Sequence, residues 1–139
     1  MIAALVLLLA GLNGVLAWSA DTCTQNSPDA PYAGIFTVVL NMIGIAMLAW
    51  KGRPVGTLVA ASLAAPFALF YSGKWLQLID GATACNILTG AGSWEPSGDE
   101  PRLVLLWTAA VLSFWLGLAF ALWRGYRERA HKMKQENNV

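Results

Sequence analysis

The chain has 139 residues, of which 57% are hydrophobic and 12% are charged, and its formal net charge at pH 7 is +1. Soluble domains carry about 25% charged residues, so the composition excludes an ordinary soluble protein and predicts an integral membrane protein. The 7 Trp, 5 Phe and 3 Tyr exclude disorder, because disordered chains contain few aromatic residues. The small net charge provides no basic face for phosphates, which excludes nucleic acid as a partner.

Four apolar segments follow one another along the chain. A membrane span needs about 20 mostly apolar residues, and the candidates are residues 2–20, 32–50, 55–73 and 103–123. Lipid cannot hydrogen-bond the backbone, so each segment is predicted to be a helix. We therefore expect an all-α fold, a four-helix transmembrane bundle over residues 1–123. The short link at residues 51–54 predicts that the second and third helices are antiparallel neighbours.

The charges beside the spans predict the topology, because Lys and Arg near spans remain in the cytoplasm. The short link and the tail at residues 124–139 hold seven cations, namely Lys51, Arg53, Arg124, Arg127, Arg129, Lys132 and Lys134. The loops at residues 21–31 and 74–102 hold only Lys74 and Arg102, together with most acidic residues. We expect both termini to be cytoplasmic, the two loops external and the tail a basic cytoplasmic segment.

The first segment has a second interpretation as a cleaved signal peptide, with residues 15–17 as a small-residue processing site. No Lys or Arg precedes its apolar run, and the run is long for the apolar core of a signal peptide. We expect the segment to remain as a helix. Cleavage would leave three helices with the same sidedness.

Aromatic side chains mark the expected boundaries of the spans, because Trp and Tyr prefer the headgroup depth. At the outer boundary we expect Trp18, Tyr32, Tyr71 and Trp75, and at the inner one Trp50, Trp123 and Tyr126. Trp107 and Trp115 are deeper in the fourth segment and are predicted to be packing residues.

The two cysteines, Cys23 and Cys85, fall one in each external loop. Disulfides persist in oxidising compartments, here expected to be the periplasmic side of a bacterial inner membrane. A Cys23–Cys85 disulfide would tie the two hairpins together and is worth about 3–4 kcal/mol in the chain-entropy model. The alternative is two unpaired cysteines near the membrane interface.

In topology the chain resembles the quinone-linked disulfide-bond oxidases of bacterial membranes, which also have four helices, internal termini and external cysteines. The resemblance implies thiol–disulfide exchange as an activity. Those enzymes carry a cysteine pair in each of two external loops, whereas Cys23 and Cys85 each stand alone. Electron relay between dithiols needs two pairs, because every step passes through a mixed disulfide. The residues therefore favour a structural bridge.

Two groups of polar residues are candidates for binding or packing. Asn13 and Asn41 lie within apolar runs, and we expect a hydrogen bond between them, worth about 1 kcal/mol. Lys74 follows the third segment and is interpreted as an anchor whose ammonium reaches water. Its alternative role is in a site for an anionic headgroup or a quinone-like carbonyl, with Tyr71, Trp75 and Gln77 beside it.

Small residues recur at every fourth position in the third and fourth segments. The two ridges are Gly56, Ala60, Ala64, Ala68 and Ser72, and Ala109, Ser113, Gly117, Ala121 and Gly125. Positions four apart share one helix face, and small side chains allow helices to approach closely in lipid. One ridge would serve the bundle and the other a partner chain. The sequence leaves open which ridge has which role.

Residue types that perform catalysis or hold cofactors are scarce. His131 is the only histidine, and no candidate span contains a carboxylate, although proton-coupled transport generally requires one. We expect a non-catalytic accessory, assembly or scaffold subunit with no cofactor or metal. Its expected partners are membrane lipids and either another membrane protein or a second copy of itself. The alternative function is binding or transport of a lipid-like or quinone-like molecule.

Overall fold

The computed structural model describes residues 1–19, 23–24, 27–28, 30–92 and 94–136. Four helices dominate it, α1 (Ile2–Ser19), α2 (Gly34–Lys51), α3 (Pro54–Ile79) and α5 (Glu100–Glu136). Each of the four is long and apolar enough to cross a membrane, which confirms the helical fold with four candidate spans. The smaller elements are β1 (Cys23–Thr24), β2 (Ser27–Pro28), the 3-10 turn η1 (Ala30–Ala33) and α4 (Ala84–Thr89).

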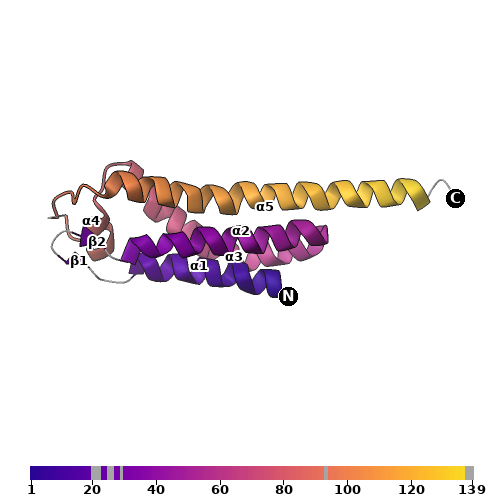
Figure 1. Cartoon of the computed structure of the whole chain (residues 1–139), viewed down its shortest axis with the longest axis horizontal. Coiled ribbons are helices and arrows are strands. Elements are labelled where there is room, and N and C mark those ends of the chain that lie inside the picture. The colour runs from indigo at the N-terminus through magenta and orange to yellow at the C-terminus, as the bar shows by residue number, and fades with distance from the viewer. Residues whose placement is uncertain (20–22, 25–26, 29, 93, 137–139) are drawn as a thin grey trace.

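The four long helices run alongside one another in an elongated bundle (Figure 1). Both chain ends lie toward one end, here named the terminal end (Figure 1). The opposite end carries β1, β2 and α4 and is named the loop end (Figure 1). α5 continues well beyond the other helices at the terminal end, so its last turns stand apart from the bundle.

The neighbours in the bundle differ from the expected ones. α1 packs against both α2 and α3, and α5 packs against the same two helices. α2 and α3 therefore lie across a diagonal, and the expectation that the short link makes them neighbours is wrong. The link itself turns sharply at Gly52, which has a φ of 54° and donates its N–H to the Leu48 carbonyl at 3.2 Å. Pro54 then opens α3, where a missing N–H costs little.

Two helices extend past the predicted ends of their spans. α3 continues to Ile79 because the residues after Gly73 still have inward packing partners, including Leu78, which is 4% exposed. α5 begins at Glu100 and continues through the basic tail to Glu136. Within that tail, Arg124 and Glu128 are one helical turn apart and form an ion pair, with 3.0 Å between Nε and Oε1. Such a pair stabilises a helix that is exposed to water.

Both ridges of small residues serve the bundle, but not over their whole length. On α3, Ala60, Ala64 and Ala68 are at most 1% exposed, whereas Gly56 is exposed. On α5, Ala121 is buried, Ser113 and Gly117 are half-buried, and Ala109 is exposed. Each ridge therefore serves the bundle over part of its length, while Gly56 and Ala109 remain at the surface.

Glycines on α1 and α2 provide the space for large neighbouring side chains. A β-carbon placed on Gly14 would lie 2.6 Å from Cδ1 of Tyr71, and one on Gly44 would lie 2.7 Å from Cγ of Leu7. Real β-carbons do not approach so closely. These glycines therefore hold α1 close to α3 and to α2, where dispersion contacts replace the hydrophobic drive that lipid removes.

Replacing Gly14 by Ala should destabilise the bundle by about 1–3 kcal/mol, because the new methyl group overpacks a site whose aromatic neighbour cannot move away. The matched control is Gly73→Ala on α3, where a β-carbon meets nothing within 4 Å. That change should be neutral or stabilise the helix by up to about 1 kcal/mol. Unfolding of both variants in detergent micelles measures the difference, and equal stability would contradict the close packing at Gly14.

Candidate functional site

A cluster of aromatic rings fills the bundle axis near the loop end. Trp18, Tyr71 and Trp107 come from α1, α3 and α5 and are at most 2% exposed. The Trp107 ring centroid is 5.3 Å from that of Trp18 and 5.6 Å from that of Tyr71. The prediction that Trp107 is a packing residue is confirmed. Trp18 and Tyr71, which were predicted at the outer headgroup level, are enclosed within the bundle, where Gly14 leaves room for the Tyr71 ring and Gly34 for the Trp107 ring.

Asn41 joins three helices from a position that is 1% exposed. Its side-chain amide lies 3.2 Å from the carbonyl oxygen of Ala110 and 3.3 Å from Oγ of Ser113, to both of which it donates. The hydroxyl oxygen of Tyr71 is a longer acceptor at 3.4 Å. Asn41 thus links α2 to α5 along one seam and to α3 across the diagonal.

The predicted hydrogen bond between Asn13 and Asn41 is wrong. Asn13 instead donates to the carbonyl oxygen of Ala33 at 2.9 Å and to Oγ1 of Thr37 at 3.0 Å. Both acceptors lie at the start of α2, at least one helical turn closer to the loop end than Asn41. The two asparagines were expected to pair because they lie in antiparallel spans. In the structure Asn13 contacts the start of α2, whereas Asn41 contacts α5 and α3.

The four residues considered for a ligand site at the end of α3 do not converge. Tyr71 is enclosed in the aromatic cluster, and Gln77 is exposed. Trp75 donates its indole N–H to Oγ1 of Thr108 at 2.8 Å, which joins α3 to α5. The Lys74 ammonium lies 5.6 Å from the centroid of the Phe70 ring on its own helix. The structure therefore does not bring these four side chains together into one site.

A disulfide between Cys23 and Cys85 closes the loop end, as predicted. The two Cα atoms are 5.7 Å apart, and the bond joins β1 to α4. Thr83 caps the start of α4 by accepting the N–H of Asn86 at 3.2 Å. Cys85 is 2% exposed because α4 turns its apolar side toward the bundle. The bridge therefore anchors the connection after α1 to a buried point on the connection after α3.

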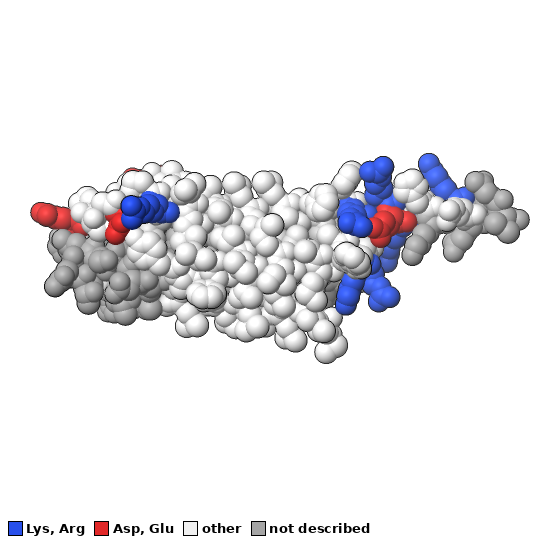
Figure 2. Space-filling view, in the orientation of Figure 1, with Lys and Arg blue, Asp and Glu red and all other residues white. Residues whose placement is uncertain are grey.

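Charged side chains gather at the two ends and leave a long uncharged middle (Figure 2). The described acidic residues of the loop end are Asp80, Glu95, Asp99 and Glu100, while Asp21 and Asp29 lie outside the described residues. Burial and a hydrogen bond with the Asp99 carboxylate raise the pKa of Tyr32 at this end. The terminal end is basic, which preserves in three dimensions the charge asymmetry of the sequence.

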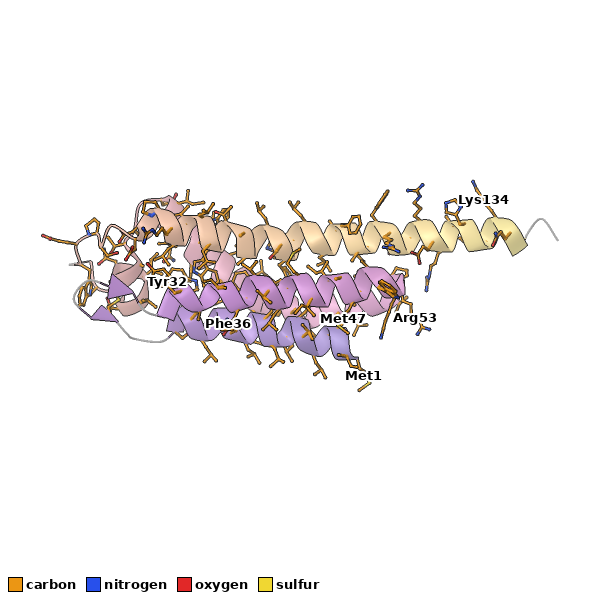
Figure 3. The ribbon with its side chains drawn as sticks, in the orientation of Figure 1. Met1, Tyr32, Phe36, Met47, Arg53 and Lys134 are labelled. Atoms are coloured by element: carbon orange, nitrogen blue, oxygen red, sulfur yellow. A yellow bond between two sulfur atoms is a disulfide. The ribbon has the colours of Figure 1, made fainter. Side chains whose placement is uncertain are left out.

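A basic hollow of about 340 Å³ opens at the terminal end, where the α2–α3 link meets α5. It is lined by Lys51, Gly52, Arg53, Glu128 and Arg129. Arg53 and Met1 lie near each other at this end, whereas Lys134 stands farther out on α5 (Figure 3). The charge pattern of the sequence predicts that these cations share one side of the membrane. The hollow that the link and the tail form together could not be predicted, because the two segments are far apart in the chain.

Two apolar grooves lie on different seams of the bundle. The α2–α5 groove has a volume of about 380 Å³ and is lined by Met42, Ile45, Ala46, Ala49, Ser113, Leu116, Gly117 and Phe120. The α1–α3 groove has a volume of about 360 Å³ and is lined by Met1, Ala4, Leu5, Leu8, Gly56, Val59 and Leu63. The predicted ridges of small residues include Gly56, Ser113 and Gly117, which line these grooves. The grooves also depend on which helices pack together, and the ridges alone do not predict that.

The arrangement indicates a small polytopic helical membrane protein with a disulfide at one end. No group of three or more His, Cys, Asp or Glu able to hold a metal occurs among the residues described here. The chain matches no protein-family model, and the comparisons with curated proteins and with solved structures found no match. Its function is therefore argued from the grooves, the basic hollow and the disulfide.

Cys85 is buried and Cys23 is half-buried, which predicts that the disulfide exchanges slowly with thiols, since an attacking thiolate must reach one of the two sulfurs. Incubation of the folded protein with reduced glutathione should leave both cysteines unavailable to a maleimide. A strong reductant added after unfolding in detergent should make both available. Rapid labelling of the folded protein under glutathione would instead favour the exchange activity implied by the oxidase-like topology.

The Asn41 contacts predict a measurable energetic coupling between α2 and α5. A double-mutant cycle with Asn41→Ala and Ser113→Ala should give about 0.6 kcal/mol, the average for interhelical hydrogen bonds in a membrane protein. The matched cycle pairs Asn13→Ala with Ser113→Ala and should be additive, because these residues share no partner. Both cycles are read from unfolding in mixed micelles. Coupling of equal size in the two would contradict the separate networks.

Proposed function

We propose that this protein is a non-catalytic scaffold or accessory subunit of a membrane complex. In this role it receives a membrane-spanning helix of another protein in the α2–α5 groove. The observation that carries the proposal is the lining of that groove, which combines small residues with large apolar ones. A second copy of the chain is the alternative occupant, and the experiment below separates the two.

The groove has the features that favour helix association in lipid. Ala46 on α2 is exposed, so a helix backbone can approach closely there. Ser113 and Gly117 on α5 are half-buried and line the same groove, with Ile45 of α2 packed against Gly117. Met42 and Leu116 stand beside them and are 59% and 63% exposed. Methionine adapts its shape to irregular partners. These features support a complementary helix as the occupant.

The packed bundle axis supports a role as a platform. Trp18, Tyr71, Trp107 and Phe114 are all at most 2% exposed and occupy the interior, where closely packed side chains resist deformation. The space available to other molecules consequently lies at the seams between helices. A rigid body with open seams suits a subunit that positions other proteins.

The projecting part of α5 supports a second contact with the same partner outside the membrane. From Arg124 to Glu136 the helix extends for about 20 Å, and Lys134 stands well clear of the bundle (Figure 3). Arg127 lies 5.5 Å from the Trp123 ring centroid, a contact suited to the membrane boundary. Lys134 is available to acidic surfaces of a partner.

The charge asymmetry supports an orientation for this subunit. The basic terminal end would face the cytoplasm, with both chain ends there, because cations beside spans are retained on that side. The disulfide would then lie on the opposite side, where oxidising conditions preserve such bonds. We place the protein in a bacterial inner membrane with the loop end toward the periplasm.

Filling the α2–α5 groove tests the proposal. Ala46→Phe should reduce the amount of co-purified partner about tenfold, since overpacking costs about 1–3 kcal/mol. The matched control is Ala119→Phe, which adds the same volume at an exposed position of α5 outside the lining of this groove. The measurement is gentle purification from native membranes, with mass spectrometry of the bound proteins and of in-membrane crosslinked products.

The outcomes of this experiment are distinct. Loss of one defined partner with Ala46→Phe alone supports the subunit function. Loss of a crosslinked homodimer with Ala46→Phe would make a second copy the occupant. A chain that purifies alone as a monomer, or equal effects of the two variants, would overturn the proposal.

A further inference from the structure

The basic hollow at the terminal end carries unbalanced positive charge. Lys51, Arg53 and Arg129 line it together with a single acidic residue, Glu128. Oε1 of Glu128 already accepts from Nε of Arg124 at 3.0 Å. Among the side chains that the structure describes, none of the three lining cations takes part in an ion pair. The hollow therefore favours an anion.

The basic hollow continues into the α1–α3 groove. A smaller hollow of about 170 Å³ shares Lys51 and Arg53 with the basic hollow and extends to Met1 and Gly56. The α1–α3 groove starts at the same Met1 and Gly56 and passes along α3 to Leu63. From Gly56 to Leu63 it follows α3 for about 10 Å. The three hollows thus adjoin one another through shared residues and pass from charged to largely apolar surroundings, and together they are named the path.

Gly56 keeps the junction of this path open. A β-carbon at Gly56 would meet only the Arg53 β-carbon, at 3.9 Å, among side-chain atoms within 4 Å. No helix packs against this position, so the absence of a side chain is not required by the bundle itself.

We infer that this path binds one anionic phospholipid from the surrounding bilayer. Its phosphate would lie among Lys51, Arg53 and Arg129, and one acyl chain would pass Gly56 into the α1–α3 groove. Charged residues give way to apolar ones along the path, in the order in which a lipid headgroup gives way to its hydrocarbon chains. Basic pockets between membrane helices bind anionic headgroups in this way. The acyl-chain part of this site is on a different seam from the α2–α5 groove, and the inference does not depend on the subunit function.

The first test uses native mass spectrometry of the full chain in micelles that contain equal amounts of phosphatidylglycerol and phosphatidylcholine with identical acyl chains. The wild-type protein should retain about tenfold more phosphatidylglycerol than phosphatidylcholine, because two or three cations at the membrane surface favour the anionic lipid by at least that factor. Equal retention of the two lipids would overturn the inference. Displacement of the bound lipid by an equal concentration of glycerol phosphate would also overturn it, since a free anion would then suffice.

The second test separates the acyl-chain part of the site from its charge. Gly56→Phe should block the junction and reduce phosphatidylglycerol retention about tenfold, a loss typical of overpacking a filled groove. Gly56→Ala is the matched control and should retain the lipid, because a methyl group fits the open space. Thermal unfolding of both variants should match or exceed that of the wild type, which establishes that the fold is intact. Unchanged retention in Gly56→Phe would overturn the two-part site.

The third test concerns the placement of the charge. Lys51→Met should weaken phosphatidylglycerol retention about fivefold, the value of one cation near a membrane surface. Lys134→Met removes the same charge from the projecting part of α5, outside the hollow, and should leave retention within about twofold of the wild type. Equal losses in the two variants would indicate diffuse attraction to the micelle and would overturn a defined headgroup site.

Discussion

The structure depends on the close approach of helix backbones at glycine and alanine, because lipid provides no hydrophobic drive for helices to associate. Several helix glycines face a large side chain of another helix, as Gly14 faces Tyr71 and Gly34 faces Trp107. These complementary pairs place α1 and α5 between α2 and α3 and allow the indole and phenol rings to fill the axis. Asn41 then adds directional hydrogen bonds at the same level. The order of helices around the bundle follows from this matching and not from the shortness of the link at Gly52.

The sequence predicted the features that depend on one segment at a time. Length and apolarity identified four spans, because a bilayer imposes the same thickness on every helix. The distribution of cations predicted which connections share an end of the bundle, and the structure brings Arg53 and Arg129 to one hollow there. The pairing of Cys23 with Cys85 was also predictable, since the chain has only two cysteines and both fall in connections on the same side.

Features that depend on which helix faces meet could not be predicted in the same way. The expectation for Tyr71 came from its depth along α3, but its position is decided by the gap at Gly14 on another helix. The expected pairing of Asn13 with Asn41 failed for a related reason, because Asn13 faces the start of α2. A periodic pattern shows which residues share a face, whereas the partner of that face depends on the shape of a second helix. Both grooves and the basic hollow arise from such pairings.

The filled axis has a consequence for how the surface can be used. Because aromatic rings occupy the centre, the seams between helices are where partners can bind without repacking the core. Ala46 opens one seam and Gly56 opens another, and these positions lie on α2 and α3, which are diagonal to each other in the bundle. A partner helix and a phospholipid therefore need not compete for the same surface. A lipid bound beside Gly56 would remain in place when the α2–α5 groove is vacated, so association with a protein partner would be reversible without changing the lipid environment of the opposite seam.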